Sequence, residues 1–164
     1  MFEVTKTYGH NLGLSATFRQ WRASSHCRFL HGYALEVKFT FRAPRLNANN
    51  WVIDFGSLKP VKEWLCDTFD HKTLIAEDDP ALPLFEDLSR PKRNGQLIDI
   101  VKVPATGCEG FARYIADKVN EILFSGDHVP QGGIDNGVFL YSVEVREHGA
   151  NSAIYYPGGF DPHA

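Results

Sequence analysis

A strict alternation of apolar and polar side chains, from Tyr33 to Arg42, constrains the fold of this chain more than any other feature. The apolar set comprises Tyr33, Leu35, Val37, Phe39 and Phe41, and the other set comprises Ala34, Glu36, Lys38, Thr40 and Arg42. Because successive side chains of a β-strand point to opposite faces, this pattern predicts a half-buried strand. His31 shares the parity of the apolar set, so we expect its ring to point inward at the start of the strand.

Alternation elsewhere in the chain predicts three more strands. The first runs from residue 2 to 19 and is interrupted near Gly9 and Gly13, because glycine inside a strand pattern usually marks a bulge. Two more strands are predicted over 137–147 and 151–156. The earlier of these two is expected to place four side chains on one face: Phe139, Tyr141, Val143 and Val145.

Two helices are predicted between these pairs of strands. One apolar stripe follows Asp54, and another follows Thr106, whose hydroxyl is expected to form a capping box with Glu109. The proline-containing stretch 76–96 is expected to be a surface excursion, and 97–103 a short extra strand. The order strand, strand, helix, helix, strand, strand predicts an α+β domain in which two helices cover one face of a four-stranded antiparallel sheet.

Length, charge and cysteine content restrict the class of protein. The chain is expected to form one domain over residues 1–164, with 76–103 as an insertion between the helices. A formal charge of −3 gives no electrostatic basis for binding nucleic acid, and no apolar run approaches the roughly 18 residues of a membrane span. Three cysteines at scattered spacings and the lack of a signal-peptide pattern predict a reduced, cytoplasmic protein.

Cys27 is the first candidate for chemistry. It lies in a polar loop between His26 and Arg28, and both neighbours favour a thiolate. Cys66 and Cys108 are expected on the apolar faces of their helices, where a free cysteine is usually inert. An inert Cys27 remains the alternative.

Asp70, His71 and Glu147 are the other candidates. Asp70 and His71 are adjacent at the end of the first helix, where a carboxylate can orient an imidazole and raise its basicity. Adjacent side chains often point apart, so two unrelated surface residues remain the alternative. Glu147 has the parity of the apolar face of its strand, and a carboxylate there needs a partner. It is therefore either an anchor for a ligand with paired N–H donors or an exposed residue at a frayed strand end.

Six short motifs lie in a specific order along nearly the whole chain. They are Leu14-Ser15-Ala16 (F-S-A-x-H), Cys27 to Tyr33 (C-x-x-x-H-G-H), Val52 to Phe55 with Leu58-Lys59 (V-x-D-F-x-x-L-K), Asp70-His71-Lys72 with Leu74 (D-H-x-x-L), Glu109 (P-T-x-E) and Val145-Arg146-Glu147 (V-x-E). Together they resemble the family of 6-pyruvoyl-tetrahydropterin synthase and 6-carboxy-tetrahydropterin synthase.

The resemblance implies a tunnelling fold (T-fold), whose subunits assemble as homo-oligomers, trimers or hexamers, with active sites between subunits. It implies a lyase that acts on 7,8-dihydroneopterin triphosphate or a related dihydropterin. Cys27 would be the general base that removes a carbon-bound proton, and Asp70 with His71 would form the proton relay. Glu147 would hold the 2-amino and N3–H edge of the pterin.

The family's zinc site is altered in this sequence. Family members hold zinc with three histidines, but here Phe18 and Tyr33 stand at two of those positions and His31 at the third. A single histidine is expected to bind zinc too weakly for it to persist, unless His10, His26 or Cys27 joins it as a ligand. Two functions therefore compete: a lyase that works with little or no zinc, and a non-catalytic pterin- or purine-binding protein. Retention of Cys27, Asp70 and His71 favours the lyase over the binding protein, and an inward Glu147 argues against a purely structural oligomer.

Overall fold

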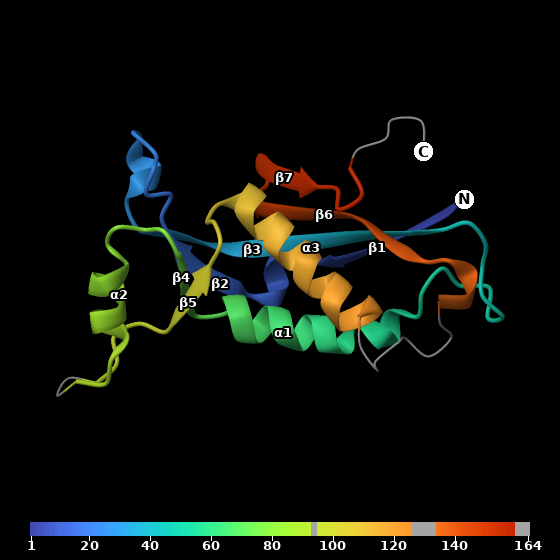
Figure 1. The fold of residues 1–164 in the computed structure, drawn as a ribbon, viewed down its shortest axis with the longest axis horizontal. Helices are drawn as coiled ribbons and strands as arrows, with labels where there is room; N and C mark the ends of the chain where they lie inside the picture. The colour runs from blue at the N-terminus through green and yellow to red at the C-terminus, as the bar shows by residue number, and fades with distance from the viewer. Residues whose placement is uncertain (93–94, 126–133, 160–164) are drawn as a thin grey trace.

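The computed structural model describes residues 1–92, 95–125 and 134–159, in which one sheet and three α-helices form. The elements are β1 (Phe2–Tyr8), β2 (Leu14–Phe18), β3 (His31–Ala43), α1 (Lys59–Phe69), β4 (Lys72–Ala76), α2 (Leu82–Ser89), β5 (Ile100–Val103), α3 (Cys108–Phe124), β6 (Phe139–His148) and β7 (Asn151–Tyr155). Helices α1 and α3 cross one face of the sheet, and α2 lies at the end formed by β4 and β5 (Figure 1). The predicted α+β class and the predicted pair of helices on one face are confirmed.

Strand β3, which the alternation predicts as a half-buried strand, is the centre of the sheet. Its second half pairs with β1 and its first half with β2, both antiparallel, and β6 pairs with its other edge. A short 3-10 segment over His10–Leu12 separates β1 from β2, and Gly13 closes it with φ of +76°, a left-handed conformation that suits glycine. The predicted interruption of the first strand is therefore confirmed.

The sheet has more strands than predicted. Seven strands form it in the described residues, because the first predicted strand is divided into β1 and β2, and β4 and β5 extend the sheet beyond β2 in parallel register. β5 confirms the short extra strand expected over 97–103, whereas β4 was not predicted. Residues 73–76 of β4 are all buried, so this strand shows no alternation in the sequence. The segment 76–96 also differs from the predicted surface excursion, because it contains α2. Pro83 lies in the first turn of that helix, where a missing N–H is tolerated.

Two local predictions for the second half of the chain are wrong. A bulge in β6 opposite Thr40 and Phe41 changes the parity of the strand, so that Tyr141 and Phe139 do not share the buried face of Val143. The capping box at α3 does not form either. The N-cap is Gly107, with φ of 97°, and the Thr106 hydroxyl donates instead to the carbonyl of Arg19 at 2.7 Å.

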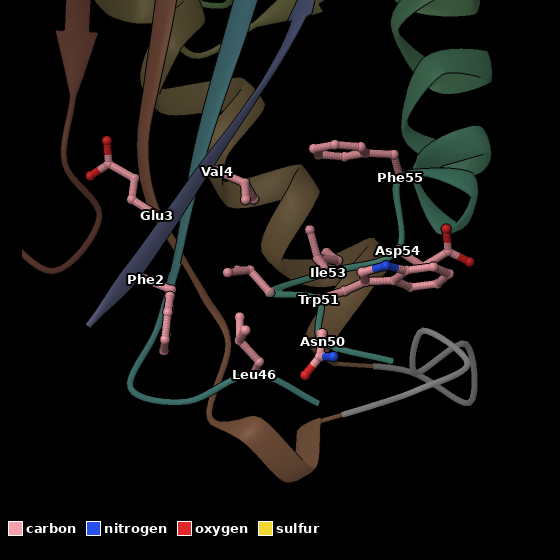
Figure 2. Close-up of a pocket in the computed structure, with 10 residues that line it drawn as sticks. Phe2, Glu3, Val4, Leu46, Asn50, Trp51, Ile53, Asp54 and Phe55 are labelled. Carbon is pink, nitrogen blue, oxygen red and sulfur yellow. The ribbon is translucent and has the colours of Figure 1, made fainter. Parts of the chain in front are cut away.

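An apolar hollow of about 450 Å³ lies beside β1 and the segment that leads into α1. Phe2, Val4 and Leu46 form one side, and Trp51, Ile53 and Phe55 approach from the other (Figure 2). Phe2, Trp51 and Phe55 keep about half of their surface exposed. No helix in the described part of the chain has both the length and the apolar character needed to cross a membrane.

Candidate functional site

A polar pocket of about 350 Å³ lies where the start of α3 faces the hairpin of β6 and β7. The residues that line it are Gln20, Gly107, Cys108, Glu109, Glu147, Ala150, Asn151 and Ser152. Two carboxylates and two amides are among them, so this pocket offers directional hydrogen bonds rather than apolar contact. Its chemistry suits a planar ligand with several donors and acceptors.

Glu147 lies on the wall of this pocket with its side chain 19% exposed. A second irregularity in the pairing of β6 with β7, between Arg146 and His148, leaves Glu147 as the extra residue. Its Oε1 accepts a hydrogen bond of 2.8 Å from the Asn151 amide, and its Oε2 lies 4.0 Å from the Cys108 Sγ. The predicted inward position agrees with this partial burial.

Cys108 belongs to the buried apolar core, as expected, and it also lines the pocket. Burial raises the pKa of its thiol to about 11, and the negative charges of Glu147 and Glu109 add to the shift. At neutral pH the thiol is therefore protonated and donates weakly to Glu147. Cys108 supports the orientation of Glu147 and is a poor nucleophile.

Cys27 lies in a short 3-10 segment, His26–Arg28, that Ser25 caps. Its thiol is half-buried, and its carbonyl accepts a 2.9 Å hydrogen bond from the backbone N–H of Gln20, a residue that lines the polar pocket. The loop is therefore hydrogen-bonded to a residue of the pocket wall, although Cys27 itself does not line the pocket.

Three rings occupy the inward face where β2 meets β3. Phe18 is opposite His31 in the register, with ring centroids 4.9 Å apart, and Tyr33 lies 5.7 Å from His31. The inward orientation predicted for His31 is thus confirmed. Partial burial raises the pKa of the Tyr33 phenol, and the negative charge of Glu147 and then of Cys27 add to it. Tyr33 therefore lies within electrostatic reach of both the pocket and the Cys27 loop.

Asp70 and His71 form a hydrogen-bonded pair just after α1. The Nδ1 of His71 lies 2.8 Å from Asp70 Oδ1, which also accepts from the backbone N–H of Ser15. His71 has φ of 57°, a left-handed conformation that costs a non-glycine residue about 1 kcal/mol or more. The two side chains therefore point toward one another, which the sequence left open.

The sheet separates this pair from the other candidates. His71 is 85% exposed and lines a second cavity, of about 470 Å³, with Ser15 and Thr17. In β2 these two residues alternate with the buried Ala16 and Phe18, so they face the opposite side. Within one chain, the structure brings Cys27, Tyr33, Cys108 and Glu147 to one side of the β2–β3 pair and leaves Asp70 and His71 on the other.

Asn151 and Gln20 are pocket residues that sequence reasoning missed. Asn151 is the first residue of β7, and Gln20 follows β2 in a loop. Both are common polar residues at ordinary loop positions, with no pattern to distinguish them. The sequence offered one indirect signal for them. Glu147 shares the parity of the inward-facing residues of its strand, and a carboxylate there requires a polar partner nearby.

Comparison with known proteins places the chain in a family. The model of the family described as 6-pyruvoyl tetrahydropterin synthase matches residues 9–158. The chain belongs to this family. A 6-carboxy-5,6,7,8-tetrahydropterin synthase of Rickettsia typhi is 37% identical over 124 residues, which cover 74% of this chain and 78% of that protein. With the same enzyme of Rickettsia felis, 37% identity extends over 54 residues, 32% of this chain and 39% of that protein.

The fold is that of the 6-pyruvoyl tetrahydropterin synthase family, the T-fold. The solved structure of the Plasmodium falciparum 6-pyruvoyl tetrahydropterin synthase superposes with a TM-score of 0.64 at 16% identity, and the match covers 94% of this chain and 96% of that one. The additional strands β4 and β5 continue the sheet without changing this fold class.

The residues present do not fit the zinc site that membership of the 6-pyruvoyl tetrahydropterin synthase family implies. Among the described residues, no three His, Cys, Asp or Glu side chains converge as metal ligands. Phe18 is fully buried and packs edge-on against Phe111, with ring centroids 5.0 Å apart, so an apolar ring occupies one ligand position. The Nδ1 of His31 lies 2.7 Å from the Phe29 carbonyl. Phe18, His31 and Tyr33 therefore form a packed aromatic cluster rather than a set of three zinc ligands.

Proposed function

We propose that this protein is a pterin-processing lyase that acts on 7,8-dihydroneopterin triphosphate or a related dihydropterin. The observation that carries the proposal is the partly buried Glu147 in the polar pocket. A pterin presents its 2-amino group and N3–H along one edge, and two such donors match the two oxygens of a carboxylate. Asn151 and Cys108 each contact one oxygen of Glu147 and hold the carboxylate in place for this pairing.

Cys27 would perform the proton abstraction. As a thiolate it would accept a proton from the side-chain carbon next to the pterin ring, while the electron pair of the broken C–H bond moves into the adjacent C6=N5 bond and N5 takes up a proton from water. The hydroxyl oxygen on that side-chain carbon keeps its bond to carbon. The Tyr33 phenol, whose raised pKa keeps it protonated, would donate a hydrogen bond to that oxygen. Cys27 and Tyr33, the two groups in this step, lie on the same side of the sheet.

Asp70 and His71 would complete the site from a neighbouring subunit. The sheet separates them from Cys27 within one chain, and His71 is exposed, so a second copy is needed to bring the two together. We therefore propose a homo-oligomer, a trimer or hexamer, in which the Asp70–His71 pair of one subunit returns the proton in the site of the next. The strained backbone of His71 is consistent with a residue held in place for chemistry.

Mixing two inactive variants tests this arrangement. We expect Cys27→Ala and His71→Ala each to abolish turnover of 7,8-dihydroneopterin triphosphate, followed by the loss of its dihydropterin absorbance and the release of triphosphate. When the two variants are co-expressed in equal amounts, random assembly gives one intact pair in about a quarter of the interfaces. Turnover should therefore return to about a quarter of the wild-type value.

Two results would contradict the proposal. Unchanged turnover in Cys27→Ala would show that another group is the base. Inactive variants that stay inactive when co-expressed would show that Cys27 and His71 do not act across subunits.

A non-catalytic pterin- or purine-binding protein is the second candidate, because Phe18 occupies a position of the family's zinc site. The two candidates differ in one measurement on the wild-type protein. Tight binding of dihydroneopterin with no consumption of its triphosphate would favour the binding protein.

A further inference from the structure

An ion pair between Arg19 and Asp79 connects the segment that follows β4 to the loop that carries Cys27. Arg19 Nε donates to Asp79 Oδ2 at 2.8 Å, and its Nη2 donates to Oδ1 at 2.7 Å. The Asp79 side chain is 1% exposed and that of Arg19 is 23% exposed. Two parallel contacts between a guanidinium and a carboxylate fix both groups in distance and in plane.

Both partners are held by further contacts. Asp79 Oδ1 also accepts from the Ala81 N–H at 2.8 Å, and the hydrogen bond to Arg19 keeps the pKa of this carboxyl below its ordinary value. The guanidinium of Arg19 lies 5.8 Å from the ring of Phe85 in α2, and the Thr106 hydroxyl holds the Arg19 carbonyl. The pair is thus partly buried, with the carboxylate of Asp79 enclosed and the Arg19 side chain at the boundary with solvent.

The contacts continue from Arg19 and its neighbour Gln20 to the backbone carbonyls of Cys27 and Arg28. Arg19 Nη1 reaches the Arg28 carbonyl at 3.5 Å, and the N–H of the next residue, Gln20, donates to the Cys27 carbonyl at 2.9 Å. A displacement of Arg19 would therefore change the position of Cys27, although Asp79 itself does not face the polar pocket.

The preceding residue, Asp78, provides a natural contrast. It accepts hydrogen bonds from Arg22 and, at 3.0 Å, from the Trp21 indole, which lie in the same loop. The Arg22 and Asp78 side chains are 70% and 47% exposed. Exposed ion pairs of this kind contribute little to a structure, whereas breaking a buried pair leaves an uncompensated charge.

We propose that the Arg19–Asp79 pair is a positioning device that holds Cys27 in place for proton abstraction, and that the segment after β4 serves this purpose. The proposal rests on the catalytic role proposed for Cys27. Asp79 and Arg19 act through the loop backbone and do not contact substrate.

The test compares Asp79→Asn with Asp78→Asn in the full-length protein. Iodoacetamide alkylation of Cys27, Cys66 and Cys108 is followed separately by peptide mass spectrometry. We expect Asp79→Asn to accelerate alkylation of Cys27 by at least about fivefold, because local opening of the loop exposes the thiol. Rates at Cys66 and Cys108 should not change, and Asp78→Asn should react like the wild type at all three positions.

Turnover gives a second readout. We expect Asp79→Asn to lower kcat by about 100-fold with KM within about twofold of wild type, because a misplaced base affects the chemical step and leaves the Glu147 pocket intact. Arg19→Lys keeps a positive charge but loses the two-pronged contact, so it should behave like Asp79→Asn even if that variant folds poorly.

The outcomes separate this inference from the proposed function. Equal acceleration at all three cysteines would show a general structural role and overturn the inference, as would unchanged alkylation of Cys27. If the wild-type protein has no turnover, the proposed function fails, and the alkylation rates still decide whether the pair positions Cys27.

Discussion

The polar pocket at the β6–β7 hairpin and the apolar hollow beside β1 are similar in size and opposite in chemistry. The pocket, of about 350 Å³, is lined by carboxylates and amides, whereas the hollow, of about 450 Å³, is lined mainly by apolar and aromatic side chains (Figure 2). Apolar contact is not directional, so it can stabilise an occupant without orienting it. Hydrogen bonds to fixed carboxylates do orient an occupant. Volume alone would favour the hollow, but chemistry favours the pocket as the reaction site.

The difference has a local structural cause. Glu147 is the extra residue of an irregular pairing, so its carboxylate is re-aimed and held by Asn151 from the opposite strand. The hollow contains Asp54, but that carboxylate accepts from the Gly56 N–H at 2.8 Å and so caps the short helix before α1. The carboxylate at the first site is the one we propose for ligand recognition, whereas the carboxylate at the second caps the backbone.

The largest change we expect is a gain of zinc next to the pocket in Phe18→His/Tyr33→His. Phe18, His31 and Tyr33 lie on one face with ring centroids 4.9 to 6.2 Å apart, so three imidazoles there could converge on one ion. We expect one zinc per subunit, bound at least about 1000-fold more tightly than by the wild type, since three ligands replace one. Metal analysis of protein dialysed against zinc buffers measures this.

A matched variant, Phe18→Leu/Tyr33→Phe, changes the same two positions without adding donors and should bind no more zinc than the wild type. Folded double-histidine protein with wild-type zinc content would show that the β2–β3 face does not preserve the geometry of a metal site.

The next largest effect separates the pocket from the hollow directly. We expect Glu147→Ala to weaken dihydroneopterin binding by about 1–3 kcal/mol, roughly 5- to 150-fold, because it leaves the donors of the pterin edge unpaired. Trp51→Ala removes a large side chain from the hollow and should leave this affinity unchanged. Calorimetric titration of both variants gives the two affinities, and a loss confined to Trp51→Ala would place the ligand in the hollow instead.

Most of the fold could be predicted because its strongest signals are periodic. The alternation from Tyr33 to Arg42 predicted β3, and the glycine-containing interruption predicted the break between β1 and β2. Strand β4 could not be found this way, because nearly all of its side chains are buried and none marks a solvent face. The parity error at Tyr141 has a similar origin, since the sequence does not show where a bulge inserts.

Some candidate residues of the site could be named from the sequence, but their arrangement could not. The sequence identified Cys27, Asp70, His71 and Glu147 as candidates, and their roles stay predictions. It could not show that the sheet divides them, because that depends on which face of β2 each segment approaches. Asp79 was also inaccessible to sequence reasoning, since its burial depends on a contact with Arg19, 60 residues earlier.

The smallest effect we expect is on the pH dependence of stability, and it comes from the Cys108 thiol. Burial in the pocket and the charges of the nearby glutamates raise the pKa of this thiol. Its pKa is raised from 9.0 to about 11, so below pH 9 the thiol is protonated in both folded and unfolded chains and its contribution to stability is complete. Between pH 9 and about 11 the unfolded chain ionises first, which removes about 2–3 kcal/mol from the free energy of unfolding. Urea unfolding across this range should therefore show a steeper loss of stability for the wild type than for Cys108→Ala.

Cys66→Ala, which retains Cys108, should follow the wild type. Glu147→Gln should show a shallower loss than the wild type, because the Glu147 charge is the second cause of the shift. If the wild type and Cys108→Ala lose stability in parallel, the environment of the pocket does not reach this thiol.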